Sequence, residues 1–222
     1  MPPDWFRSPA WDEQARTEFE AKLARSAAHN RPQYLRIKAI ALDGVGLTDD
    51  ALTLLRRVTD DYPDSLFCAS AFELQGDILR RTGDLAAAED RYRTVLARRP
   101  DLNATSGMAP VSLAEVLLER HGTSAVEEVR SLLSYPALRL VFNSQLVRAL
   151  TLSSRTAAVE GDDALRRAEA RRALDLVGAA PQLSRHPDVG VPAPSEAELR
   201  ELERLASDAG VSPKKRKWLR RP

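Results

Sequence analysis

The amino-acid sequence predicts an all-α protein in which stacked helices are connected in pairs. Alanine, leucine, arginine and glutamate, all strong helix formers, are abundant, whereas aromatic residues make up only 5% of the chain. Apolar side chains recur with the helical period of about 3.6 residues, and no segment alternates as a half-buried strand would. Glycine turns and proline stops alternate between the helical segments. This rhythm is typical of repeated helix–turn–helix pairs.

Residues 1–31 are expected to contain an aromatic segment followed by a capping helix. Asp12 is the expected N-cap of a helix over 13–26. Three aromatic residues precede or open this helix, and we expect them to cover the apolar face of the first helix pair. The alternative is an exposed anchor for a partner, because tryptophan is enriched at binding hot spots. The three residues are Trp5, Phe6 and Trp11.

Residues 32–182 are expected to form the array of helix pairs, which is clearest over 32–101. The first pair is predicted over 33–42 and 49–61, and the second over 69–81 and 85–98. In each pair a glycine turn separates the helices and a proline ends the second one. Small residues recur where a neighbouring helix is expected to cross. They are Ala39 and Ala51 in the first pair, and Gly76 and Ala88 in the second.

The second pair reads Phe72-x2-Gln75-Gly76-x2-Leu79, then Ala88-x3-Tyr92, then Pro100. In this pattern the segment 32–101 resembles the tetratricopeptide-repeat (TPR) family. Lys38 and Gln75 depart from the family at positions where leucine is usual. The spacing between Pro63 and Pro100 is 37 residues (100 minus 63), rather than about 34. The resemblance implies an α-solenoid of TPR-like pairs with N- and C-terminal capping helices.

The outline of a helix pair returns after residue 101 with a weaker match. Helices are predicted over 111–120 and 124–133, with Glu127 where alanine is usual, and over 146–159 and 163–177. Residues 183–194 contain several prolines and are expected to be an irregular linker. Ser195 and Glu198 form a capping box in front of a C-terminal capping helix over 195–210. A basic tail, 211–222, completes the chain.

The resemblance also implies a binding site, because the first helix of each pair lines a concave groove in this family. Carried onto this chain, the groove would recognise a peptide or a helix of mixed charge. The favoured function is therefore a non-enzymatic adaptor that binds another protein, whose identity and stoichiometry the sequence leaves open. The alternative is an ordinary solvated helix face. The groove residues are Arg36, Asp43, Glu73, Asp77, Arg80, Arg148 and Arg155.

The charges are balanced over the whole chain but not along it. Lysine and arginine number 33 against 32 aspartates and glutamates, so the net charge gives no reason to expect nucleic acid. Six of the cations gather in the tail, a pattern that suits binding to nucleic acid or to an anionic surface. A simply solvated terminus is the competing interpretation. The six are Lys214, Lys215, Arg216, Lys217, Arg220 and Arg221.

Catalytic and metal-binding motifs find little support. Cys68 and the three histidines, His29, His121 and His186, share no spacing typical of a nucleophile with its base or of a zinc site. Gly44-x-Gly46 follows a predicted helix rather than a strand, so it does not indicate dinucleotide binding. We therefore expect no enzyme activity, no cofactor and no metal, and Cys68 as a small core residue. The single cysteine, the polar N-terminus and the lack of a membrane span predict a cytoplasmic protein.

Overall fold

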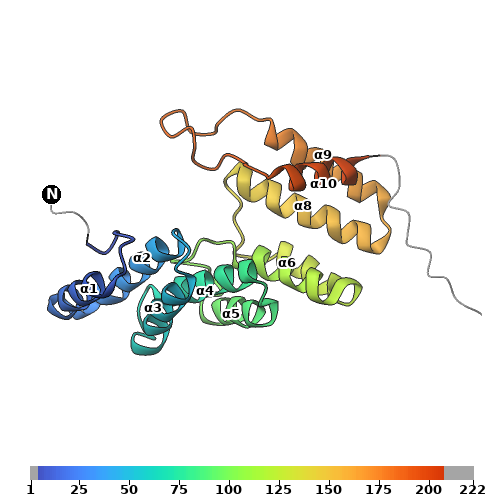
Figure 1. The fold of residues 1–222 in the computed structure, drawn as a ribbon. Helices are drawn as coiled ribbons and strands as arrows, with labels where there is room; N and C mark the ends of the chain where they lie inside the picture. The colour runs from blue at the N-terminus through green and yellow to red at the C-terminus, as the bar shows by residue number, and fades with distance from the viewer. Residues whose placement is uncertain (1–4, 208–222) are drawn as a thin grey trace, which may run out of the picture. The chain divides into compact units, whose positions relative to one another are not determined.

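The computed structural model describes residues 5–207, and over that range it is all-helical (Figure 1). Helices pack sequentially along the chain, which confirms the all-α prediction. The chain divides into two compact units. Unit 1 runs to Arg120 and includes Tyr135–Leu138; unit 2 comprises His121–Ser134 and the residues from Arg139 onward. None of the helices between residues 5 and 207 is long and apolar enough to cross a membrane.

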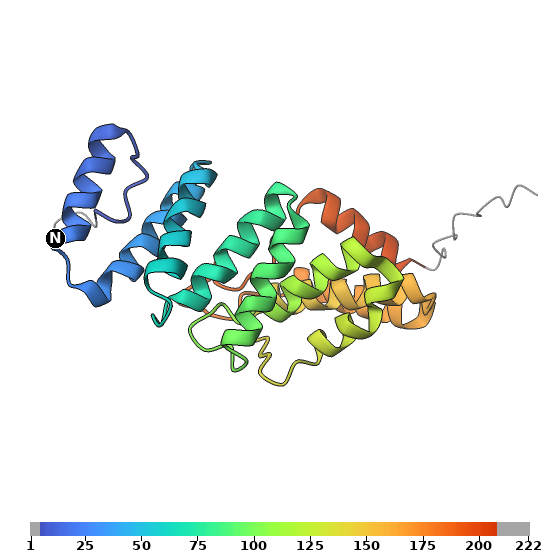
Figure 2. The same ribbon diagram turned by 90° about the horizontal axis from the view of Figure 1, so that it is seen from below.

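Unit 1 contains the two clearest predicted pairs. Helix α2 lies against α3 and α4 lies against α5, and α3 also packs on α4 (Figures 1 and 2). A 3-10 turn, Ala28–Asn30, leads from α1 into α2. The helices are α1 (Glu13–Arg25), α2 (Arg31–Asp43), α3 (Thr48–Asp61), α4 (Cys68–Thr82), α5 (Leu85–Arg98) and α6 (Ala109–His121).

The ends of these helices follow from local sequence. Asp12 caps α1, its carboxylate accepting a hydrogen bond from the Ala15 amide at 2.8 Å, as predicted. Asp84 caps α5 in the same way, accepting from the Ala87 amide at 3.0 Å. Helix α4, which directly precedes α5, ends at Gly83, whose φ of 89° lies in the left-handed region that favours glycine. The α4–α5 pair is thus defined by its own turn residues.

The predicted small positions lie where helices cross. Ala39, Ala51 and Ala88 are fully buried. Gly76 faces the ring of Tyr92, and a Cβ atom at Gly76 would lie 2.7 Å from that ring. A small residue at position 76 thus lies where α5 packs on α4, as the sequence predicted.

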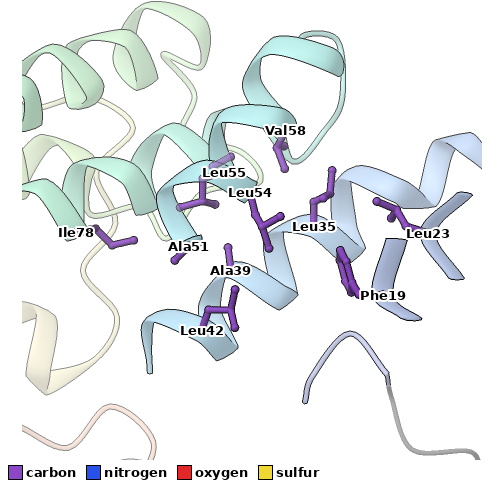
Figure 3. Close-up of a cluster of buried hydrophobic side chains, with 11 residues drawn as sticks. Phe19, Leu23, Leu35, Ala39, Leu42, Ala51, Leu54, Leu55, Val58 and Ile78 are labelled. Atoms are coloured by element: carbon purple, nitrogen blue, oxygen red, sulfur yellow. The ribbon is translucent and has the colours of Figure 1, made fainter. Parts of the chain in front are cut away.

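A continuous apolar core extends from α1 to α4 (Figure 3). Leu35 and Leu42 of α2 meet Leu54 of α3 there, and Phe19 of α1 closes the N-terminal side. The N-terminal aromatic residues pack onto this end. Trp5 lies 5.2 Å and Trp11 5.5 Å from Phe19 between ring centroids. The prediction that the aromatic segment covers the first helices is confirmed.

Lys38, the departure from the repeat pattern on α2, is only 2% exposed. Its ammonium donates hydrogen bonds to the backbone carbonyls of Ser8 (2.6 Å) and Ala10 (2.8 Å). It also lies 4.9 Å from the Trp11 ring centroid, a cation–π contact. Burial lowers the pKa of the Lys38 ammonium. Lys38 therefore holds the aromatic segment against α2, where a leucine would supply no donor.

Unit 2 is built on a further helix pair, with α8 against α9, and α10 packs along α9. Gly122–Ala125 forms a 3-10 turn before α7. The capping box at Ser195 is present as predicted, with the Ser195 hydroxyl accepting from the Glu198 amide and the Glu198 carboxylate accepting from the Ser195 amide. The predicted stop at Gly210 lies outside the described residues, and α10 ends before it. The helices are α7 (Val126–Leu133), α8 (Asn143–Glu160), α9 (Asp163–Val177) and α10 (Glu196–Ala206).

Candidate functional site

Helices α2 and α4, the first helices of the two clearest pairs, carry five of the predicted groove residues. On each helix these residues are separated by three, four or seven positions, which places them on one face. We call this surface the α2–α4 face. Besides the five predicted residues it contains Ile40, one turn after the first of them. The five are Arg36 and Asp43 on α2, and Glu73, Asp77 and Arg80 on α4.

Glu73 is buried, with 4% of its surface exposed, instead of facing solvent. Its carboxylate accepts hydrogen bonds from the Ser106 amide (2.7 Å) and the Ser106 hydroxyl (2.6 Å). Burial raises the pKa of the Glu73 carboxyl, and the Ser106 hydrogen bonds oppose that shift. Ser106 belongs to the connection between α5 and α6, where Leu102 and Ala104 adopt positive φ angles of 59°. Glu73 therefore binds the chain's own loop and is not free to meet a partner.

Three further charges on the face join neighbouring helices. Arg80 pairs with Glu115 of α6, and Asp43 pairs with Arg81 of α4. Asp77 accepts a hydrogen bond from the hydroxyl of Tyr92 at 2.8 Å. Burial raises the pKa of the Tyr92 phenol, and the Asp77 carboxylate raises it further. These groups contribute to packing between helices, whatever else they bind.

Arg36 differs from the rest of the predicted set in unit 1. Its Nε atom is buried, and no hydrogen-bond partner for it exists among the described residues. Burial lowers the pKa of the guanidinium, and the nearby Glu73 carboxylate counters the shift. One turn further along α2, Ile40 is 45% exposed. A half-buried cation with an unused donor thus lies beside an exposed apolar side chain.

In unit 2 the predicted residues Arg148 and Arg155 lie on α8. Arg155 donates two hydrogen bonds to the Glu201 carboxylate of α10, at 2.9 and 2.6 Å. The charge expected to meet a partner helix therefore meets a helix of the same chain. The sequence predicted α10 as a capping helix but did not predict this pairing. The available signal was an acidic residue directly before the apolar stripe of an amphipathic helix.

The remaining predicted sites add no chemistry to these two surfaces. Cys68 is buried at the start of α4 as a core residue, and burial raises the pKa of its thiol. Among residues 5–207 no group of three or more histidine, cysteine or acidic side chains could hold a metal ion. The six basic tail residues, Lys214 to Arg221, lie outside the described residues.

No model of a protein family matches the chain, and no curated protein matches it significantly. The function proposed below is therefore inferred from the residues themselves.

Proposed function

We propose that the chain is a non-enzymatic protein-interaction module, a TPR-like helical array that binds a peptide or helix on the α2–α4 face. The observation that carries the proposal is the Nε of Arg36, which is buried with no hydrogen-bond partner among residues 5–207 and lies beside exposed Ile40. The single cysteine of the sequence, which leaves no internal disulfide, supports a cytoplasmic setting.

A buried donor without an acceptor lowers stability, because the group has lost its hydrogen bonds to water. A partner that offers an oxygen acceptor to Arg36 restores such a bond and gains the charge-assisted strength of a guanidinium pair. Ile40 adds apolar area one turn away on the same face. The ligand class that fits is therefore a segment with an acidic side chain next to an apolar one.

The test is affinity capture from host lysate on immobilised full-length protein, with bound proteins identified by mass spectrometry. The double variant Arg36→Glu/Ile40→Ser should reduce capture of the specific partner at least about tenfold, because one such contact is worth about 1.4 kcal/mol or more. Arg56→Glu, an exposed arginine on α3, is the matched control and should leave capture unchanged. Circular dichroism must report equal helix content in all three proteins. Equal capture by the double variant rejects the α2–α4 face.

A second candidate function is association with nucleic acid or an anionic surface through the tail residues 214–221. The segregation of six cations within eight positions carries it. Such binding should weaken steeply with salt and disappear when the chain is truncated after Gly210. Binding that is insensitive to salt, or that survives the truncation, rejects this candidate.

A further inference from the structure

Unit 2 contains a complete recognition surface for a helix, and α10 occupies it. The surface is formed by α8 and α9. It provides apolar side chains that pack against the helix, an arginine that pairs with an acidic side chain of the helix, and a buried arginine that binds the carbonyls at the helix end. We call it the α8–α9 seat. Its residues are Val147, Arg155, Arg166, Ala170 and Ala173.

Arg166 is the central group of the seat. It is fully buried, at 0% exposure, and its Nε donates to the Asp163 carboxylate at 3.0 Å. One terminal nitrogen donates to the carbonyl of Leu205, and the other to the carbonyl of Ser207 at 3.3 Å. These carbonyls lie at the C-terminal end of α10, where a helix leaves its last carbonyls unsatisfied and carries the negative end of its dipole. Arg166 therefore recognises a helix end through the backbone, without reference to side-chain identity.

Side-chain selectivity comes from two other contacts. Arg155 forms its two-bond pair with Glu201, a geometry that a guanidinium and a carboxylate share. Leu202 and Leu205 are buried in a cluster with Val147, Ala170 and Ala173. The α8–α9 seat therefore selects helices that contain the sequence Glu-Leu-x-x-Leu and end within one turn after it.

The attachment of α10 is narrow. Only Leu202, Leu205 and Ala206 of its residues are buried. Its N-terminus is capped within the helix itself by Ser195 and Glu198, so this cap does not depend on the seat. The linker before α10 has its own contact with α8, since the Gln182 side chain accepts from the Asn143 amide at 2.7 Å. The helix can therefore leave while the linker stays in place.

From these contacts we infer that the α8–α9 seat is an exchangeable helix-binding site, with α10 as its built-in occupant. The partner is a short amphipathic helix that ends soon after a Glu-Leu-x-x-Leu sequence, and it binds by displacing α10. This inference extends the proposed function to a second surface and does not depend on Arg36 or Ile40.

The experiment uses the full chain and a fluorescein-labelled peptide of residues 195–207 as probe. In the wild type, α10 competes at the millimolar effective concentration typical of a tethered segment. The variant Leu202→Glu/Leu205→Glu should release α10 and bind the peptide at least tenfold more tightly than the wild type, measured by fluorescence anisotropy. Adding Arg155→Glu to this variant should remove most of that gain. A peptide carrying Glu201→Arg should then restore it.

Three results would overturn the inference. The released variant, with α8 and α9 intact by circular dichroism, shows no saturable peptide binding. The variant loses the cooperative unfolding of unit 2, which would make α10 an integral core element. Wild-type protein elutes as a dimer that shares α10 between copies, which would assign the seat to self-association.

Two further measurements test the α8–α9 seat independently of the α2–α4 face. Hydrogen exchange on the wild type should show the amides of α10 exchanging faster than those of α8 and α9, and equal protection would contradict an exchangeable occupant. Arg36→Glu in the released background should leave peptide affinity unchanged. The proposal for the α8–α9 seat can thus be rejected while the proposal for the α2–α4 face is kept, and the reverse.

Discussion

The two ends of the described chain are held by buried cations that bind backbone carbonyls, but the two environments differ. In unit 1 Lys38 donates to Ser8 and Ala10 of an extended segment, beneath aromatic rings. In unit 2 Arg166 donates to the last carbonyls of α10 and also pairs with Asp163. In each unit a terminal segment packs on the apolar core and covers surface that would otherwise face water.

The difference lies in what surrounds each cation. The N-terminal segment adds Trp5, Phe6 and Trp11 to the core and continues directly into α1. Helix α10 adds two leucines and an alanine, and most of its surface remains exposed. We conclude that the N-terminal cap is an integral part of unit 1, whereas the C-terminal cap is attached through a few replaceable contacts.

The largest expected effect is at the aromatic end. Phe19→Ala removes a 3% exposed ring that contacts both Trp5 and Trp11. The free energy of unfolding of unit 1 should fall by about 4 kcal/mol, the usual loss for a buried phenylalanine. Urea titration followed by tryptophan fluorescence measures it in a Trp218→Phe background, where Trp5 and Trp11 are the reporters. A loss below about 1 kcal/mol would show that the N-terminal cap is not integral.

Next comes Arg166→Met, which leaves the Leu205 carbonyl without its buried donor and Asp163 without its partner. The expected loss in unit 2 is about 3 kcal/mol, since a hydrogen bond from a charged group contributes about 1.5–3 kcal/mol. Arg172→Met is the control, because that arginine is 66% exposed and its pair contributes little. Hydrogen exchange should locate the loss of protection in α10. If the two substitutions reduced the free energy of unfolding equally, Arg166 would not be holding the end of α10.

Lys38→Met should cost less than Arg166→Met, about 1–2 kcal/mol in unit 1. The substitution leaves two carbonyls without a donor, but it also removes the desolvation penalty of a buried ammonium. The same fluorescence-detected urea titration measures it. If Lys38→Met costs more than Phe19→Ala, the hydrogen bonds to Ser8 and Ala10 outweigh the aromatic contacts in holding the segment.

The smallest effect is a dependence on pH. Burial lowers the pKa of Lys38 below its ordinary value of 10.5. Between that lowered pKa and 10.5 the unfolded chain binds more protons than the folded chain, so this group makes the protein more stable as the pH rises. The difference in unfolding free energy between wild type and Lys38→Met isolates the contribution from other titrating groups. A difference that stays constant from neutral pH to 10.5 would contradict the burial of a charged ammonium.

The helix pairs were predictable because their signals are local. Periodicity, the N-cap at Asp12, the turn at Gly83 and the capping box at Ser195 each depend on residues within a few positions. Lys38, Glu73 and Arg166 were not predictable in the same way, because their partners lie about 30 to 40 residues away. Most of those partners are backbone groups, which leave no side-chain pattern in the sequence. The expectation that Glu73 lines an open groove failed for this reason.

The close contact of Gly76 with Tyr92 has a consequence for sequence variation. A Cβ at position 76 would lie 2.7 Å from a fully buried ring that is also hydrogen-bonded to Asp77. A larger residue at position 76 alone would cause strain, and a smaller residue at position 92 alone would leave an empty space between α4 and α5. In diverged copies of this chain, alanine or serine at position 76 should therefore be accompanied by a smaller residue at position 92. Such paired substitutions would record the α4–α5 contact as covariation.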